Sequence, residues 1–496
     1  MDTSINRNIL YTSISNLITP AFTFLFWLVT AKVSGPDTIG IAATIASITL
    51  IISTFVVLDT RLGMKRYMGI AISIGDTGKF KQILVSTVIF VSITITISAV
   101  IIAIPNFRMM DLIGIDRQYV WLVIAIIPAT AFNSIFSEAL VAAQQSKKLV
   151  LPLVIGSALR FPLLFGIIYV SNTSALGVII SYSAFLFIST AFYSVYLAKL
   201  VRKSQVRSLG NFVSNLRQVL SAGLASWIPH ILSVLGSQLA IVSVFSLQGA
   251  AETGKFYLPM AIFSFTQFVV AGINRVSHPL IAGMSSTEEQ TSFVSYNIKL
   301  AFIFTMPITI FLLFYGGDLL GILGKDYASA QSTLAIFMLG MPLTIVTEII
   351  YYFIYGIGNI RTLLYLGLAG NIPRIVLYFI AIPLFGLDGA AYSYLVGSLA
   401  QSVLSIEVAK RQSLPIPYKS CIILTAVPLL MGVFIWISHI HPILSALIIL
   451  FGSPLIYIRL GLFTDPEIRS LLYTSLPKTI AEKIYPLLSR IIQKIT

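Results

Sequence analysis

The sequence contains little charge. Only 10% of its 496 residues are Asp, Glu, Lys or Arg, whereas about a quarter of a typical soluble chain is charged. Mean hydropathy is +0.93 and 57% of the residues are hydrophobic. The apolar residues form long runs, such as 39–58, 89–104 and 422–437, rather than narrow stripes. One soluble core cannot bury this much apolar sequence, so the composition predicts a membrane protein.

Cysteine and histidine are also scarce. Cys421 is the single cysteine, so one chain cannot form a disulfide bond or a cysteine-ligated metal site. The four histidines lack the spacing of metal ligands, and no phosphate-binding Walker loop or dinucleotide fingerprint occurs. The acidic residues of the predicted outer loops are too dispersed to suggest a catalytic centre. These absences predict a protein that is not an enzyme and that holds no cofactor or metal.

The long apolar runs predict an all-α polytopic membrane protein with about fourteen transmembrane helices. Each run is close to the ~20 residues that cross the ~30 Å hydrocarbon layer. The first run is too long for the apolar part of a cleavable signal, so it is expected to remain as a span. The predicted spans are 9–31, 38–58, 82–104, 119–142, 149–170, 175–198, 218–246, 255–274, 296–316, 330–353, 362–383, 388–408, 420–439 and 442–462.

The basic residues predict the orientation. Of the 32 lysines and arginines, 25 fall in connections on one side of the membrane and five on the other. Because lysine and arginine accumulate on the cytoplasmic side, both termini are expected in the cytoplasm of a cell-membrane protein. The same distribution accounts for the net charge of +14 without a nucleic-acid partner.

The two halves of the chain show an internal repeat. Three pairs of residues are separated by 214 positions: Gly40 and Gly254, Arg61 and Arg275, and Arg160 and Arg374. Six spans separate equivalent positions, and an even number preserves orientation, which predicts two six-helix lobes related by an axis along the membrane normal. The alternative is coincidence among similar apolar segments.

The repeat suggests a division of the chain. Residues 1–200 form the predicted N-lobe, residues 201–410 the C-lobe, and residues 411–463 an additional helix pair. Residues 464–496 form a cytoplasmic tail in which apolar residues recur at helical spacing between basic ones, as in a helix that lies on the inner leaflet. The alternative is a frayed tail.

Two arginines inside predicted spans are the main candidates for a functional site. Arg160 lies about eleven residues into span 149–170, and Arg374 about twelve into span 362–383. Inserting the pair costs about 5–7 kcal/mol before compensation, so each should face a polar cavity or a partner. One interpretation is an anion site for phosphate or pyrophosphate. The other is an Arg–Glu pair that fixes the packing, with Glu138 and Glu348 as partners.

Arg61 and Arg275 lie at the inner ends of their spans. The default role there is to set orientation or to contact anionic lipid headgroups. The alternative is a position at the mouth of a cavity, where they would attract a lipid pyrophosphate from the inner leaflet.

Several stretches resemble the polysaccharide-biosynthesis flippases of the multidrug/oligosaccharidyl-lipid/polysaccharide exporter superfamily. They are Asp59–Lys81, Leu319–Ala328, Tyr355–Arg361 and Phe385–Ser393. The resemblance covers about residues 5–460. It implies two lobes around a cationic cavity, alternating access, and outward movement of a polyprenyl-(pyro)phosphate-linked oligosaccharide. On that analogy Arg160, Arg374, Arg61 and Arg275 would contact the phosphates. Membrane lipids and glycan polymerase or assembly proteins would be partners.

Two other functions stay open. A cation-coupled drug or metabolite antiporter of the same superfamily would need a carboxylate inside a lobe, and Glu138 or Glu348 could supply it. A non-transporting membrane scaffold is the third hypothesis, but a scaffold has no evident use for buried arginines. A cavity lined mainly by cations would favour the flippase, and a dehydrated carboxylate pocket would favour the antiporter.

Overall fold

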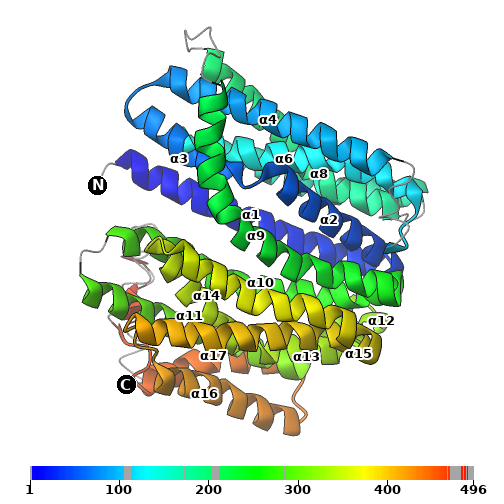
Figure 1. Cartoon of the computed structure of the whole chain (residues 1–496). Helices are drawn as coiled ribbons and strands as arrows, with labels where there is room; N and C mark the ends of the chain where they lie inside the picture. The colour runs from blue at the N-terminus through cyan, green and yellow to red at the C-terminus, as the bar shows by residue number, and fades with distance from the viewer. Residues whose placement is uncertain are drawn as a thin grey trace.

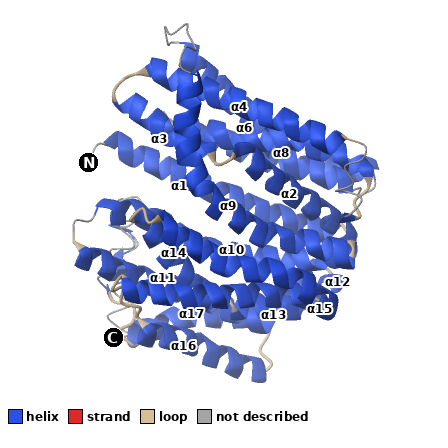
Figure 2. Cartoon of the chain, viewed as in Figure 1, coloured by secondary structure: helices blue, strands red, loops and turns tan. Residues whose placement is uncertain are grey.

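The computed structural model describes residues 3–104, 113–171, 175–202, 212–283 and 286–465, with a few isolated positions up to 489. Within these ranges, the side chains of residues 3–10, 13, 17, 225, 274–283 and 287 are not described. The described chain is helical and contains no strand (Figure 2). The predicted tail after residue 464 falls mainly outside the described residues.

The helices follow the apolar runs closely. Those of the first half are α1 (Thr3–Val33), α2 (Pro36–Val57), α3 (Thr60–Ser73), α4 (Thr77–Ala103), α6 (Val120–Ala142), α7 (Lys147–Ser171) and α8 (Ala175–Arg202), with a 3₁₀ turn at Arg117–Tyr119. Those of the second half are α9 (Phe212–Gln248), α10 (Ala250–Gly283), α11 (Thr287–Leu323), α12 (Lys325–Ala328), α13 (Gln331–Leu339), α14 (Met341–Gly356) and α15 (Ile360–Arg411), followed by α16 (Tyr418–Ile437) and α17 (Pro442–Arg459).

The described helices contain the fourteen predicted spans. Twelve are long and apolar enough to cross a membrane, and α13 with α14 forms one more span that bends by 46°. The helix α15 has 52 residues and contains two spans, because the chain reverses at Gly386, whose φ is 58° and ψ is −133°. Its two arms touch: a Cβ on Gly389 would lie 2.0 Å from the carbonyl oxygen of Ala381. The predicted fold class is therefore confirmed.

The helices form two groups that converge at one end of the molecule and diverge towards the other (Figure 1). In the first group α7 packs on α1 and α8, and α6 packs on α3 and α8. In the second group α15 packs on α9 and α14, and α10 on α11. The pair α16 and α17 packs on α11, at the outside of the second group.

The two groups meet where α2 crosses α10. A Cβ on Gly40 would lie 1.9 Å from the carbonyl oxygen of Ala250, and a Cβ on Gly254 would lie 1.9 Å from that of Pro36. The contact is reciprocal, because Pro36 and Ala250 are also 214 residues apart. Only glycine permits backbones to approach so closely. The repeat seen in the sequence is thus the pseudo-twofold contact between the halves.

The helix α9 lies in the predicted C-lobe, but it also contacts helices of the predicted N-lobe. It bends in Figure 1 and contains Pro229, which removes a helical hydrogen bond and favours a kink. Its first part packs on α3 and α4, and the helix also packs along α15. Gly63 of α3 lies against the backbone of Val219, where a Cβ would be 2.1 Å from the carbonyl oxygen. The second half of the chain therefore begins in contact with the first, and the division of the chain into domains stays a prediction.

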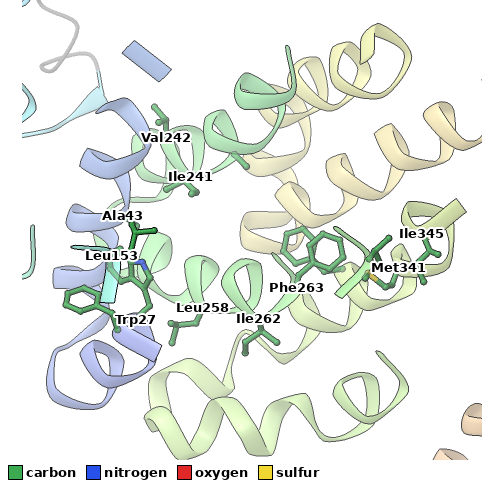
Figure 3. Packing of buried hydrophobic residues seen from close by; sticks show 14 of the residues in the cluster. Trp27, Ala43, Leu153, Ile241, Val242, Leu258, Ile262, Phe263, Met341 and Ile345 are labelled. Atoms are coloured by element: carbon green, nitrogen blue, oxygen red, sulfur yellow. The ribbon is translucent and has the colours of Figure 1, made fainter. Parts of the chain in front are cut away.

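The buried apolar residues form one large cluster that extends through both halves. In Figure 3, Trp27 and Ala43 of the first half lie to the left, and Phe263 and Met341 of the second half lie to the right. Large apolar side chains such as Phe434 are in contrast exposed on the outer helices. An apolar exterior of this kind fits a hydrocarbon solvent rather than water.

The glycine crossing gives a test of the fold. In Gly40→Ala the methyl group would overlap the Ala250 carbonyl, so the halves must separate locally, at a cost of about 1–3 kcal/mol or more. We expect a lower melting temperature in detergent. The control is Gly166→Ala in α7, where a Cβ would meet nothing within 4 Å and alanine favours the helix. Equal melting temperatures for the two variants would contradict the assignment of this contact.

Candidate substrate-binding site

A cavity of about 810 Å³ lies between the two halves, in contact with α3, α6, α9, α10, α13, α14 and both arms of α15. This volume lies in the upper part of the ~300–1,000 Å³ range of small-molecule sites. Most of the lining belongs to the second half of the chain. The first half contributes residues of α3 and the end of α6, together with Asp59.

The lining is rich in phenol, amide and hydroxyl groups. These residues are Tyr351, Tyr352, Tyr355, Tyr378, Tyr394, Gln238, Gln267, Gln401, Asn371, Ser226, Ser233, Ser237, Ser264, Ser398, Thr344 and Thr347. Amides and hydroxyls both donate and accept hydrogen bonds, and aromatic rings supply apolar faces with a polar edge. Such a surface can hold a ligand that carries many hydroxyl groups.

Arg374 lines this cavity from the first arm of α15. Its Nη1 donates to Asn371 Oδ1 over 3.3 Å, and its Nη2 donates to Ser398 Oγ of the second arm over 3.3 Å. The guanidinium carbon lies 3.8 Å from the ring centroid of Tyr394, in a cation–π contact. Its Nε is buried without a hydrogen-bond partner. The side chain is held in place but keeps donor capacity.

The two predicted carboxylate partners behave differently. Glu348 lines the cavity and lies within coulombic range of Arg374, but no ion pair joins them among the described residues. Glu138 instead pairs with Lys65 of α3, at 2.9 Å. Glu138, a candidate partner of a buried arginine, is therefore paired with a lysine instead. The last turns of α6 meet α3 there, and Arg160 lies elsewhere.

Arg61 lies in the first turn of α3 and lines the cavity, with 36% of its side chain exposed. Its Nε donates to Asp59 Oδ1 over 2.6 Å, and its Nη2 lies 3.0 Å from His230 Nε2. Asp59 Oδ2 also accepts from the hydroxyl of Ser226 over 2.5 Å. His230 and Ser226 belong to α9, so this network joins the α2–α3 corner to α9.

The corner between α2 and α3 has an unusual backbone. Leu58 and Asp59 both adopt the left-handed conformation, with φ of 47° and 51°. Such angles are uncommon outside glycine, asparagine and aspartate. The hydrogen bonds of Asp59 to α9 and Arg61 hold this conformation, and they direct α3 across the entrance of the cavity.

Arg160 does not line the cavity. It is fully buried in the first half, where its Nη1 donates to Thr23 Oγ1 over 2.9 Å. Its guanidinium lies 3.7 Å from the ring centroid of Phe185 and 5.1 Å from that of Tyr182. No carboxylate pairs with it among the described residues. The side chain of Arg275 lies outside the described residues, so its role stays a prediction.

The charge of the cavity differs from the cationic lining that the family resemblance implies. Its charged residues are Arg61, Lys65 and Arg374 on the basic side and Asp59, Glu138 and Glu348 on the acidic side. Asp59 and Glu138 are both paired at the entrance. Deeper in the cavity, one arginine and one glutamate remain.

Sequence reasoning named Glu348 of α14 but missed the three tyrosines that share its helical face. Glu348, Tyr351, Tyr352 and Tyr355 are spaced by three, four and seven residues, which places them on one helical face. This polar stripe within an apolar span was the available signal. Lys65 and His230 gave no such signal, because Lys65 is one of several basic residues in its connection and His230 is a single histidine within an apolar span.

A second pocket adjoins the entrance. It has a volume of about 600 Å³ and shares Lys65 and Tyr355 with the cavity. It continues between α3, α9 and the beginning of α15, where its lining includes the apolar residues Leu62, Ile360 and Leu363. The polar cavity thus extends into a more apolar space.

No family model matches the chain, and no curated protein matches it. Solved structures do match. The lipid II flippase MurJ, in an inward closed conformation, aligns with a TM-score of 0.71 and 14% identity over 91% of this chain and 99% of that chain. An inward-facing multidrug-resistance MATE transporter of the MOP superfamily aligns with a TM-score of 0.66 and 16% identity over 81% and 98%. The chain has the fold of these transporters.

A third match bears on the charge of the site. It is a MOP-superfamily transporter from Pyrococcus furiosus, described by a reverse polarity of its binding pocket, with a TM-score of 0.59 and 18% identity over 82% of this chain and 95% of that chain. Pocket polarity therefore varies on this fold. The narrower prediction of a polysaccharide flippase is not decided by these matches, because similarity at this level establishes the fold alone.

The network around Asp59 gives a second test. Asp59→Asn keeps a side chain that tolerates the left-handed backbone but removes the charge that Arg61 and Ser226 share. We expect a stability loss of about 1–3 kcal/mol, observed as a lower melting temperature in detergent. Asp76→Asn is the control, because Asp76 caps the exposed start of α4 and asparagine caps equally well. If both variants have the same melting temperature as the wild type, Asp59 does not stabilise the α2–α3 corner.

Proposed function

We propose that this protein is a flippase that moves a polyprenyl-(pyro)phosphate-linked oligosaccharide across the membrane by alternating access. The observation that carries the proposal is Arg374, which forms no ion pair with any described residue and lies in a cavity lined largely by phenols, amides and hydroxyls. An arginine held in this way presents a planar donor array that suits a phosphate. The fold shared with a lipid II flippase supports a lipid-linked substrate.

The head group would occupy the cavity. Its phosphate would receive hydrogen bonds from Arg374, whose Nε has no partner at present. The sugars would contact the tyrosine face of α14 and the amides of Gln267 and Gln401. Lys65 at the entrance would exchange its carboxylate partner Glu138 for the phosphate of the head group, because a partly exposed ion pair contributes little to stability.

The lipid tail needs a separate route. A polyprenyl chain cannot enter a polar cavity without a large desolvation penalty for the polar groups. The adjoining pocket between α3, α9 and α15 offers apolar contacts beside the cationic entrance. The tail would follow this pocket towards the lipid while the head group remains inside.

Alternation would use the two contacts between the halves. The α2–α10 crossing is a backbone contact between glycines at the converging end. The contact of α9 with α3 and Asp59 lies at the diverging end. A change from inward to outward access requires the diverging end to close and the crossing to open. Cytoplasmic termini, a cell-membrane location and glycan-assembly partners remain parts of this proposal.

One observation favours the antiporter as a second candidate. Glu348 lines the cavity beside Arg374, and a carboxylate inside a span is a common site for a coupled proton or sodium ion. The two hypotheses make different demands on it. In an antiporter Glu348 would alternate between the coupling cation and a cationic drug, whereas a flippase needs Arg374 for the substrate and could use Glu348 only for coupling.

The flippase is tested with proteoliposomes and a labelled polyprenyl-pyrophosphate oligosaccharide. A charged hydrogen bond contributes about 1.5–3 kcal/mol, so Arg374→Ala should reduce binding about 10- to 100-fold, with transport reduced accordingly. Arg374→Lys should recover part of it, since lysine keeps the charge but not the planar donor array. Transport that is unchanged in a folded Arg374→Ala variant would remove Arg374 from the site.

Glu348→Gln separates the two functions. In a flippase it should leave substrate binding intact and change only the dependence of transport on an ion gradient. In an antiporter it should abolish ion-driven uptake of cationic drugs, and the wild type should not move the lipid-linked oligosaccharide. The measurement is uptake with and without a proton or sodium gradient, with Glu252→Gln as control because that residue pairs with Lys255 near the start of α10.

A further inference from the structure

Arg160 is a buried cation with unused donor groups. Its side chain is 0% exposed, yet Nε and Nη2 have no hydrogen-bond partner among the described residues. Within the same part of the chain, the side chain makes one hydrogen bond, from Nη1 to Thr23. A guanidinium has five N–H donors, and in a low-dielectric interior each unsatisfied one is costly. Packing alone does not account for an arginine here, since an apolar residue would avoid that cost.

Aromatic rings surround this guanidinium. The ring centroids of Phe185, Tyr182 and Phe26 lie 3.7, 5.1 and 5.9 Å from its terminal carbon. Cation–π contacts stabilise the charge partly, but they leave the in-plane N–H groups without acceptors. The surroundings hold the cation and do not neutralise it.

The rings separate Arg160 from a third cavity, which has a volume of about 380 Å³. Thr23, Tyr182, Phe185 and Tyr257 line this cavity, and the first three also contact Arg160. The cavity shares Gln238, Met260 and Ser264 with the larger one. Arg160 therefore lies one side chain away from a space that adjoins the proposed substrate path.

The repeat relates this site to that of Arg374. Arg160 and Arg374 are 214 positions apart, and each is followed by a Ser–Tyr pair, at Tyr182 and Tyr394. Each arginine contacts its own tyrosine ring. In the second half the guanidinium reaches the cavity lining, but in the first half the rings of Tyr182 and Phe185 screen it. Arg374 in the second half is therefore accessible from the cavity, whereas the equivalent Arg160 in the first half is covered by aromatic rings.

We infer that Arg160 forms a second anion site, specific for the phosphate or pyrophosphate of the transported lipid and screened by Tyr182 and Phe185 in this conformation. The inference rests on the proposed function. The substrate first binds Arg374, and its phosphate reaches Arg160 when the halves move and the Tyr182 ring turns away. The anion then supplies the acceptors that Nε and Nη2 lack.

The test measures binding of farnesyl pyrophosphate to the full chain in nanodiscs by calorimetry. Farnesol serves as the uncharged probe with the same tail, and inorganic pyrophosphate as the head group without a tail. The variants are Arg160→Gln, Arg374→Gln, Tyr182→Ala, and Tyr182→Ala combined with Arg160→Gln. Melting temperatures without ligand are recorded for each.

We expect Tyr182→Ala to increase the affinity for both pyrophosphate probes, because it uncovers the guanidinium, and farnesol binding to stay unchanged. Adding Arg160→Gln should abolish that gain, which amounts to about 10- to 100-fold for a charged hydrogen-bond set. Arg160→Gln alone should not lower the melting temperature, since it removes an uncompensated charge.

Two results would overturn the inference. If Tyr182→Ala raises affinity equally with and without Arg160, the gain does not come from this arginine. If Arg160→Gln strongly lowers the melting temperature and leaves pyrophosphate binding intact in every background, Arg160 is a structural cation held by the rings. Failure of the proposed function gives a different result. In that case the wild type does not bind the pyrophosphate probes, and Arg374→Gln does not change their binding.

Discussion

The structure depends on the contact between α2 and α10, where two glycines let the backbones of the halves touch. Gly40 rests on the carbonyl of Ala250 and Gly254 on that of Pro36. In a membrane no hydrophobic effect drives helices together, so close packing of small residues provides the attraction. Because the contact is confined to one end of the helices, the halves can diverge elsewhere and enclose a polar cavity. The cavity is thus a consequence of where the small residues lie.

Paired and unpaired charged side chains lie at different depths in this protein. At the entrance, the Lys65–Glu138 pair is partly exposed and contributes little to stability, whereas Arg61 pairs with Asp59, which is buried and also bonded to α9. Inside, Arg374 and Arg160 have aromatic and hydroxyl contacts but no ion pair with a carboxylate among the described residues. Paired charges therefore lie at the entrance, and unpaired cations lie deeper in the protein.

The sequence predicted the spans and the depth of the arginines because bilayer thickness fixes helix length, and the 214-residue offset located the glycines that join the halves. It did not predict which side chains form ion pairs with one another. Glu138 was only a candidate partner for a buried arginine and pairs with Lys65, since span position does not determine which neighbouring helix a side chain meets. The screening of Arg160 by Tyr182 and Phe185 depends on how α7 packs on α8, and no local pattern encodes such a contact.

The α2–α3 corner contains two consecutive residues in the left-handed conformation, Leu58 and Asp59. Two left-handed residues cost roughly 1–2 kcal/mol each relative to a continuous helix, and the bonds from Ser226 and Arg61 to Asp59 offset that cost. Withdrawal of α9 would remove part of the offset and favour a straight α2–α3 helix. Asp59 therefore links the position of α9 to the curvature of α2–α3, so that a displacement of α9 would act on α3 without a hinge loop.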